Sequence, residues 1–443
     1  MDPHPQRAGM VFAPLTQHAV ERLFAAADAL LERVGIALPD DPESLAHFDT
    51  AGARISHEPD GPRVRFPPGL AGELIRRHAP ATFCQHARNP QRTVTFGTGD
   101  AVFAPASGPP FVRDRVTGRR RHARMEDFEH AARLTQASAV LNHAGGGYCE
   151  PGDRDPATRH LDMLLAKLTL TDKPISGAIR DAEQIRDSFE MARIAAGRET
   201  LDDCLVLNLL NLEPPLVLTG PVAEGIRLTA EAGQAALIAS YSMQGMTSAV
   251  TAEDALVQML AEIQAGAALA QIVRPGTPVI CGIYAVPFSM STMGPVFGAI
   301  ESAMIMAAGA QLVRELGVPF RADGAVTTAK CVDAQAGRDT ALGLGMARAI
   351  GADYVLHTAG WLESGLVFSF EKFAHDVAAL AMLQRDGGAQ ASAPPSASDT
   401  AAHTAWPATS PADSPPLAAG RHEWLLDYVR ERRRIIGGAA NGR

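Results

Sequence analysis

Four aromatic residues and one carboxylate lie near the ends of strand-length apolar runs, where together they could hold a permanent cation. They are Tyr241, Tyr284, Phe288, Trp361 and Glu363. Aromatic residues make up only 5% of the chain, so this grouping is more informative than it would be in an aromatic-rich protein. A quaternary ammonium donates no strong hydrogen bond, and aromatic faces with a nearby carboxylate bind it well. The alternative is that these rings only pack beneath the loops.

Two residues in the last third of the chain are candidate catalytic groups, His357 and Lys330. A neutral imidazole at position 357 could orient a substrate carboxylate, although a lone strand histidine can also be structural. Lys330 could clamp a carboxylate with Asp333 orienting it. In the alternative interpretation, Asp333 is the N-cap of a helix that begins near Ala334.

The cysteines do not predict a metal site. Five of them are widely spaced at positions 84, 149, 204, 281 and 331, without a C-x-x-C pair. This distribution is typical of reduced thiols rather than of disulfides or zinc ligands. A zinc-dependent barrel enzyme would need Cys and His ligands at strand ends, and only Cys281 and Cys331 come close. We therefore expect no bound metal.

From about residue 96, strand-length apolar runs alternate with helical stretches such as 252–272 and 297–316. The eight runs are 101–104, 140–144, 174–179, 205–210, 235–241, 278–286, 318–322 and 354–358. This alternation predicts an α/β fold, a (β/α)8 TIM barrel whose site lies at the carboxyl ends of the strands. An open doubly wound sheet is the alternative, but no G-x-G-x-x-G follows the first strand of a βαβ unit.

The chain divides into four parts by composition and pattern. They are an N-terminal α/β extension (1–95), the barrel (96–385), a low-complexity linker (386–420), and a C-terminal amphipathic helix and tail (421–443). The extension has helical spacing over 17–34 and 70–78, with a short strand at 64–66. The linker is almost entirely Gly, Ala, Ser, Pro and Thr, which predicts disorder.

The charge balance limits the partners. A formal net charge of −9 argues against nucleic acid or an anionic membrane surface. Two basic runs, 113–124 and 430–434, are either solvated faces or docking sites for an acidic partner protein. No signal-peptide pattern or uninterrupted apolar stretch of about 18 residues is present, so we expect a cytoplasmic protein. Apolar helical surface makes a homo-oligomer the expected state.

Several motifs resemble the trimethylamine methyltransferase family. The N-terminal part carries Ala51-Gly52-Ala53, Val64-Arg65-Phe66-Pro67 and the stretch DRVTGRRR at 114–121. The stronger matches are K-x-x-D-x-Q-A-G, beginning at Lys330, and H-x-A-G-x-L-E-x-G, beginning at His357. The resemblance covers roughly residues 15–385. It implies a barrel that moves a methyl group from a methylated amine to the Co(I) of a corrinoid carried by a cognate partner protein.

The resemblance also narrows the substrate. Trimethylamine enzymes of the family contain pyrrolysine, whereas this sequence has none. It is similar to the branch that acts on quaternary amines such as glycine betaine. Two alternatives remain open: a non-catalytic or regulatory betaine-binding barrel, and another TIM-barrel lyase or metal-dependent methyltransferase. Four methionines in two predicted loops, at 243, 246, 290 and 293, either line the corrinoid entrance or fill the core.

Overall fold

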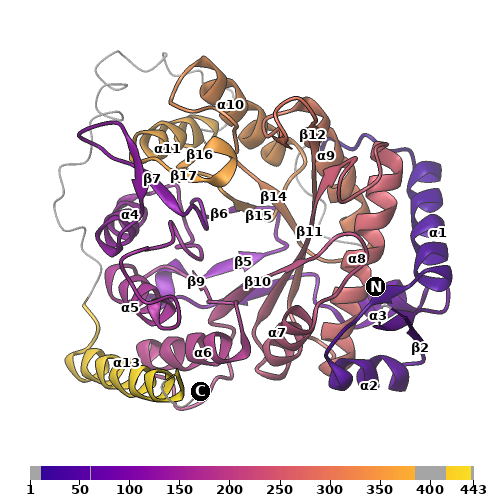
Figure 1. Cartoon of the computed structure of the whole chain (residues 1–443), viewed down its shortest axis with the longest axis horizontal. Coiled ribbons are helices and arrows are strands. Elements are labelled where there is room, and N and C mark those ends of the chain that lie inside the picture. Colours follow the sequence, from indigo (N-terminus) through magenta and orange to yellow (C-terminus); the bar gives the residue numbers. More distant parts are fainter. Residues whose placement is uncertain (1–10, 60, 385–415, 441–443) are drawn as a thin grey trace.

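The computed structural model describes residues 11–59, 61–384 and 416–440. At its centre lies a curled parallel sheet with helices outside, which confirms the predicted α/β TIM-barrel class (Figure 1). The strands follow the order β6-β15-β14-β12-β11-β10-β9. Their bounds are β6 (Val102–Phe103), β9 (Ile175–Ser176), β10 (Val206–Leu212), β11 (Ala235–Gln244), β12 (Val279–Ser289), β14 (Phe320–Asp323) and β15 (Tyr354–Leu356).

One of the eight predicted strands, the run 140–144, is wrong as a strand. The run is irregular, although its neighbourhood bonds to both edge strands of the sheet. His143 N donates to Phe103 O, Ala144 N donates to Pro174 O, and Ser176 N donates to Gly145 O. The side chain of Asn142 also accepts from Phe103 N, in place of a backbone carbonyl. The segment therefore lies between β6 and β9 without regular strand pairing.

The predicted alternation of strands and helices is confirmed. The outer helices are α4 (Met125–Ala137), α5 (Arg159–Leu170), α6 (Ala182–Ala196), α7 (Gly220–Glu231), α8 (Ala252–Val273), α9 (Ile300–Glu315), α10 (Ala334–Ala349) and α11 (Phe370–Gln384). Asp333 caps α10, because its side chain accepts from Ala336 N. The N-cap interpretation of this aspartate is thus confirmed.

The N-terminal extension covers one helix of the barrel and the amino-terminal end of the sheet. Its elements are α1 (Gln17–Arg33), β1 (Ile36–Ala37), α2 (Pro42–Thr50), β2 (Arg54–Glu58), β3 (Gly61–Arg65), α3 (Leu70–His78), β4 (Phe83–Gln85), a 3-10 turn (Pro90–Arg92) and β5 (Val94–Phe96). Helices α1, α2 and α3 all pack on α8. The β4–β5 pair lies where the barrel strands begin, and Phe96 contacts Tyr354 edge-on at 5.9 Å.

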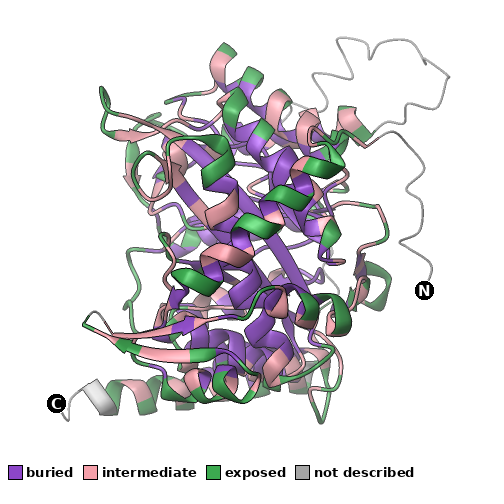
Figure 2. Cartoon of the chain, turned by 90° about the vertical axis from the view of Figure 1, so that its right-hand side faces the viewer, coloured by how far each residue is buried: buried purple, intermediate pink, exposed green. Residues whose placement is uncertain are grey.

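Helix α8 is long and apolar enough to cross a membrane, yet 83% of its most apolar window is buried within the protein. A helix that is apolar on all sides must be covered on all sides. The barrel strands cover one face of α8 and the extension covers the other. Figure 2 shows the purple buried core behind outer helices whose solvent faces are green.

A small sheet stands over the carboxyl-terminal end of the barrel. It has the order β16-β17-β7-β8 and is built from the loops that follow β15 and β6. Its strands are β7 (Phe111–Arg113), β8 (Arg120–His122), β16 (Trp361–Leu362) and β17 (Val367–Phe368), with a 3-10 turn at Glu363–Gly365. A second rim element is the hairpin formed by β12 and β13 (Gly294–Pro295).

The predicted C-terminal helix is present and begins two residues earlier than predicted, at Ala419. Helix α13 (Ala419–Ala440) packs against α5 and α6, at the lower left of Figure 1. Residues 386–415 of the predicted linker (386–420) lie outside the described residues.

Candidate active site at the barrel mouth

Two predicted residues, Tyr241 and Tyr284, lie side by side on neighbouring strands. They are register partners on β11 and β12, and their ring centroids are 6.3 Å apart with the planes at 17°. Along β11, Leu237 and Ala239 belong to the core inside the barrel. Because side chains alternate along a strand, Tyr241 faces the same interior, one layer closer to the carboxyl end.

Phe297 and Trp361 complete what we call the aromatic cluster (Tyr241, Tyr284, Phe297 and Trp361). Phe297 stacks 6.1 Å from Tyr241 and 6.4 Å from Tyr284. Trp361 meets Phe297 edge-on at 5.8 Å. The structure thus brings together three of the four predicted aromatics. The fourth, Phe288, lies in the rim hairpin, where it pairs with Pro295.

Next to the aromatic cluster lies a buried charged group, the ion pair of Arg321 and Asp323, with the His357 ring beside it. Arg321 Nη2 donates to Asp323 Oδ1 at 2.6 Å, and His357 Nε2 lies 3.8 Å from the same oxygen. The His357 ring contacts Trp361 with centroids 4.0 Å apart, so the predicted histidine does join the site. Register places Arg321 opposite Gly282. A Cβ at position 282 would lie 3.0 Å from Arg321 Cδ, so any larger residue there would have to displace the Arg321 side chain.

One hydrogen bond of the His357 ring fixes its tautomer. Ser107 N donates to Nδ1 at 3.2 Å, so Nδ1 accepts and Nε2 carries the proton toward Asp323. Burial, reinforced by the charge of Arg321, lowers the pKa of His357 well below its ordinary value. The imidazole is therefore neutral at physiological pH. Its backbone has a φ of +56°, a strained conformation for a non-glycine residue that is common at functional sites.

A cavity of about 370 Å³ opens beside the charged group. Ser107, which bonds His357, is part of its wall. The polar side chains of the wall include Glu150, Arg159, His160, Lys167 and Arg180. Glu150 pairs with Arg159 at 2.7 Å, so cationic groups outnumber carboxylates there. The electrostatics of this cavity favour an anionic group on the ligand.

The buried Lys167 of this cavity should make the free energy of unfolding depend on pH. Its Nζ is buried and donates to Ser176 O and Gly146 O, and burial lowers its pKa from 10.5 to about 7. Between these values the unfolded chain binds a proton that the folded chain does not, so stability rises with pH. In urea unfolding, the free energy of unfolding of the wild type relative to that of Lys167→Met should increase by about 2 kcal/mol from pH 7.5 to pH 9.5. A stability difference that is independent of pH would contradict this.

Glu363 and Lys330 occupy other places. The Glu363 carboxylate accepts from Arg120 Nη1 at 3.1 Å and lies 3.7 Å from Arg113 Nη2, so it belongs to the small sheet over the barrel. The Lys330 side chain is exposed on the rim, and its carbonyl accepts from Arg113. The structure therefore places neither the Glu363 carboxylate nor the Lys330 ammonium group at the aromatic cluster.

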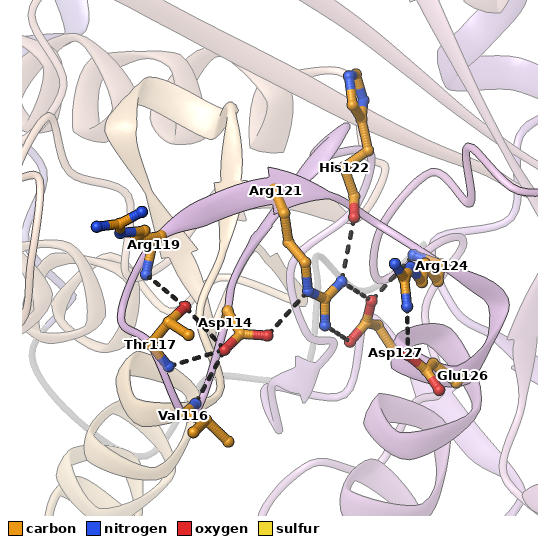
Figure 3. Close-up of polar contacts among 9 residues, drawn as sticks. All are labelled: Asp114, Val116, Thr117, Arg119, Arg121, His122, Arg124, Glu126 and Asp127. Carbon is orange, nitrogen blue, oxygen red and sulfur yellow. Dashed lines mark hydrogen bonds and ion pairs between the residues drawn. The ribbon is translucent and has the colours of Figure 1, made fainter.

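The basic run predicted at 113–124 forms the β7–β8 hairpin, whose turn is built around Asp114 (Figure 3). Asp114 accepts from the backbone N–H groups of Val116 and Thr117. Arg121 then links the turn to α4. Its Nε donates to Asp114, and its two terminal nitrogens donate to Asp127 at 2.6 and 2.8 Å. These bonds hold the hairpin at the rim of the barrel.

Removing Arg121 should destabilise the protein. Asp127 is nearly buried, and loss of its bidentate partner leaves a carboxylate with too few donors. Arg121→Ala is expected to lower the free energy of unfolding by about 2 kcal/mol, measured by urea denaturation. Arg119→Ala is the matched control, because its exposed side chain should change stability by less than about 0.5 kcal/mol. Equal effects of the two substitutions would refute the anchoring role.

The loop methionines lie mostly at the surface. Met246 is 60% exposed, Met290 76% and Met293 69%, so the core-filling interpretation is wrong for these three. They lie in the loop after β11 and in the β12–β13 hairpin, both beyond the carboxyl ends of the strands. Exposed methionines at a rim are typical of a surface that adapts to a partner.

The two cysteines considered as zinc ligands are not brought together as a site. Cys281 is buried in β12 and Cys331 is exposed. Among residues 11–59, 61–384 and 416–440, no group of three or more His, Cys, Asp or Glu side chains gathers as metal ligands. The expectation that the chain itself binds no metal stays a prediction.

Several residues of the site were missed by sequence analysis: Arg321, Asp323, Phe297, Glu150 and Arg180. The first two left a usable signal. They alternate with apolar residues in the strand FRAD at 320–323, and a two-residue period places both on the inner face. Phe297, Glu150 and Arg180 lie in loops, whose path the hydrophobic pattern does not predict.

Comparison with known proteins identifies the family. A family model for trimethylamine methyltransferase (MTTB) matches residues 2–407. The chain is 36% identical to glycine betaine methyltransferase of Desulfitobacterium hafniense (strain Y51), over 83% of this chain and 76% of the relative. It is 27% identical to proline betaine:corrinoid methyltransferase of Eubacterium limosum, over 81% and 74%.

The solved structure of Methanosarcina barkeri monomethylamine methyltransferase (MtmB) shares the fold. The TM-score is 0.56 at 11% identity, covering 97% of this chain and 89% of that one. The chain thus belongs to the trimethylamine methyltransferase (MTTB) family, as a non-pyrrolysine member similar to the betaine methyltransferases.

Proposed function

We propose that this protein transfers a methyl group from a carboxylated quaternary amine to the Co(I) of a corrinoid carried by a partner protein. The observation that carries the proposal is the aromatic cluster at the barrel mouth, with the buried carboxylate of Asp323 beside it. Aromatic faces and a nearby negative charge attract a permanent cation. The likeness to enzymes named for glycine betaine and proline betaine supports the same substrate class.

The charge pattern of the site suits a zwitterion. The aromatic cluster takes the methylammonium end, and the cationic wall of the neighbouring cavity, with Arg159 and Arg180, takes the carboxylate. Holding both ends fixes which N-methyl group points out of the barrel, and orientation of this kind is a large part of catalysis. We assign substrate binding to Tyr241, Tyr284 and Trp361, and leave Phe288, Glu363 and Lys330 on the rim.

The chain needs to supply no proton for this reaction. When a quaternary ammonium loses a methyl group, its nitrogen leaves as a neutral tertiary amine with the electron pair of the broken bond. The neutral His357, held by Ser107 and facing Asp323, fits an orienting role rather than that of an acid. Reduced cobalt, supplied by the partner, is the nucleophile that accepts the methyl group.

The rim is suited to docking the partner. The exposed methionines 246, 290 and 293 lie on one set of loops, and the β7–β8 hairpin presents the exposed arginines 115, 119 and 120 on another. Exposed methionines and exposed arginines on loops of the same rim fit an acidic protein that covers the mouth. The cytoplasmic location and the homo-oligomer stay predictions of the sequence.

A substrate panel tests the proposal. The purified protein is mixed with free cob(I)alamin and, separately, glycine betaine, proline betaine, carnitine or tetramethylammonium, and methylcobalamin is followed by its absorbance. We expect methylation with at least one carboxylated amine. Measurable binding of a betaine without methylation by any amine would instead identify a binding barrel, and activity that depends on added zinc would favour a metal-dependent enzyme.

A further inference from the structure

Helix α11 carries a buried ion pair, Lys372 and Asp376, that bonds to two loops of the barrel mouth. Lys372 Nζ donates to Asp376 Oδ1 at 2.5 Å, and both side chains are 1% exposed. Asp376 Oδ2 accepts from Gly360 N at 2.9 Å, in the loop after β15. Lys372 Nζ also donates to Ala325 O at 3.3 Å, in the loop after β14. One pair of side chains thus contacts both loops.

Thr340 of α10 lies between the two charges. Its hydroxyl donates to Asp376 Oδ1 at 2.8 Å and accepts from Lys372 Nζ at 2.8 Å. A buried ion pair is weak evidence for stability, because an apolar pair of similar volume often stabilises a core as well. An apolar pair, however, would offer no acceptor to the Gly360 N–H and no donor to the Ala325 carbonyl. The bonds to the loops are therefore what this ion pair adds.

The two loops that the pair joins carry residues of the candidate site. Ala325 is two residues beyond Asp323, and Gly360 lies between His357 and Trp361 in the chain. The loops also bond to each other, because Ala325 N donates to His357 O at 2.9 Å. A shift of one loop relative to the other would change the distance of 3.8 Å between His357 Nε2 and Asp323 Oδ1. It would also move the indole of Trp361.

We propose that Lys372 and Asp376 are positioning residues for substrate binding, which hold the loops after β14 and β15 so that Trp361 completes the aromatic cluster. The inference rests on the proposed function, in which this cluster binds the methylammonium group. Both residues act through the loop backbone, since their bonds go to Gly360 N and Ala325 O. Because Trp361 meets the cation rather than the carboxylate, loss of the pair should weaken the binding of every methylated amine alike.

Two double variants isolate the bond to Gly360. Lys372→Met/Asp376→Leu and Lys372→Met/Asp376→Asn both remove the two charges, and leucine and asparagine have the same branched shape. Only the asparagine keeps an oxygen that can accept from Gly360 N, while its amide nitrogen can donate to the Thr340 hydroxyl. Leu380→Ala is the matched control, because Leu380 is buried on the same helix and its truncation weakens the packing of α11 while the ion pair stays.

The fluorescence of Trp361 reports its position without any substrate. The chain has three tryptophans, and replacing Trp406 and Trp424 with phenylalanine leaves Trp361 alone. In this background we expect the leucine variant to shift the emission to longer wavelength under native conditions, because the indole leaves its contacts with Phe297 and the His357 ring. The asparagine variant should shift less, and the helix control should emit as the parent protein does.

Binding of two probes gives the second readout. Glycine betaine and tetramethylammonium both carry a methylated nitrogen, and their Kd values are measured by calorimetry on the full-length chain. Both values should rise about 10-fold in the leucine variant, as expected when one aromatic face of a cation site is misplaced. They should rise less in the asparagine variant. Leu380→Ala should leave both values unchanged.

Equal emission and equal Kd values in the leucine and asparagine variants would overturn the proposal, and so would a rise confined to glycine betaine. If the leucine variant does not fold, Thr340→Val, which removes only the hydroxyl between the two charges, carries the test. It should give a smaller change in the same direction, and no change would overturn the proposal. Wild-type protein that binds neither probe would contradict the proposed function and this inference together. Wild-type binding that the leucine variant leaves intact would contradict this inference alone.

Discussion

Replacing either tyrosine of the aromatic cluster with leucine should raise the KM for a quaternary amine about 10-fold, with a smaller change in kcat. Tyr241 and Tyr284 are in register and nearly parallel, so their rings lie side by side in the aromatic cluster. A cation on an aromatic face gains about 0.5–2 kcal/mol, depending on how far it is desolvated, whereas a leucine side chain offers no such attraction. Initial rates of methylcobalamin formation over a range of amine concentrations give both constants.

The conservative variants separate the ring from its hydroxyl. Tyr241→Phe and Tyr284→Phe keep the aromatic face and should stay within about threefold of wild type. Phe288→Leu provides a second control, because Phe288 lies in the β12–β13 hairpin. If the phenylalanine variants lose as much as the leucine variants, or if Phe288→Leu loses as much, the rings do not bind the cation.

The second large effect is expected at Arg321. This residue and Asp323 are both nearly buried, and burial raises the pKa of Asp323 while Arg321 opposes the rise. Without the guanidinium, the carboxylate is left uncompensated inside the barrel. Arg321→Met should therefore lower the free energy of unfolding by about 3–5 kcal/mol, measured by chemical denaturation.

A double substitution tests whether the lost charge partner is the cause. Arg321→Met/Asp323→Leu removes both charges and should recover a large part of the stability, since an apolar pair of similar volume avoids the unpaired charge. Activity should stay low in the double variant, because it lacks the Asp323 carboxylate that faces His357. A double variant no more stable than Arg321→Met would show that packing against Gly282, rather than the charge pair, holds this layer together.

The barrel could be predicted because its pattern is local. Runs such as 235–241 and 278–286 became β11 and β12, each extended past its predicted end. The run 140–144 has the same composition as a strand, yet the side chain of Asn142 replaces a backbone acceptor and the run pairs irregularly. The irregular pairing of this run depends on contacts with the neighbouring strands, and the local sequence does not predict those contacts.

The site was predictable in part for the same reason. Tyr241 and Tyr284 lie toward the carboxyl ends of β11 and β12, and His357 and Trp361 come after β15. The rule that sites lie at the carboxyl ends of barrel strands therefore pointed to them. Glu363 follows a strand too, but two arginines brought from the loop after β6 pair with its carboxylate. Tyr428 of α13 bonds to Asp187, which lies 241 positions earlier in the chain. Asp187 in turn accepts a hydrogen bond from His160. No local sequence pattern predicts contacts of this kind.

The central claim is that this barrel moves a methyl group from a betaine to reduced cobalt, and a product analysis tests it most directly. Glycine betaine with deuterated N-methyl groups is incubated with the protein and an equal amount of cob(I)alamin, and the products are measured by mass spectrometry. The account predicts deuterated methylcobalamin and dimethylglycine in equal amounts, and neither product with His357→Ala or the doubly substituted Tyr241→Leu/Tyr284→Leu protein. Unlabelled cobalamin, with glycine betaine recovered intact although it binds the protein, would contradict it.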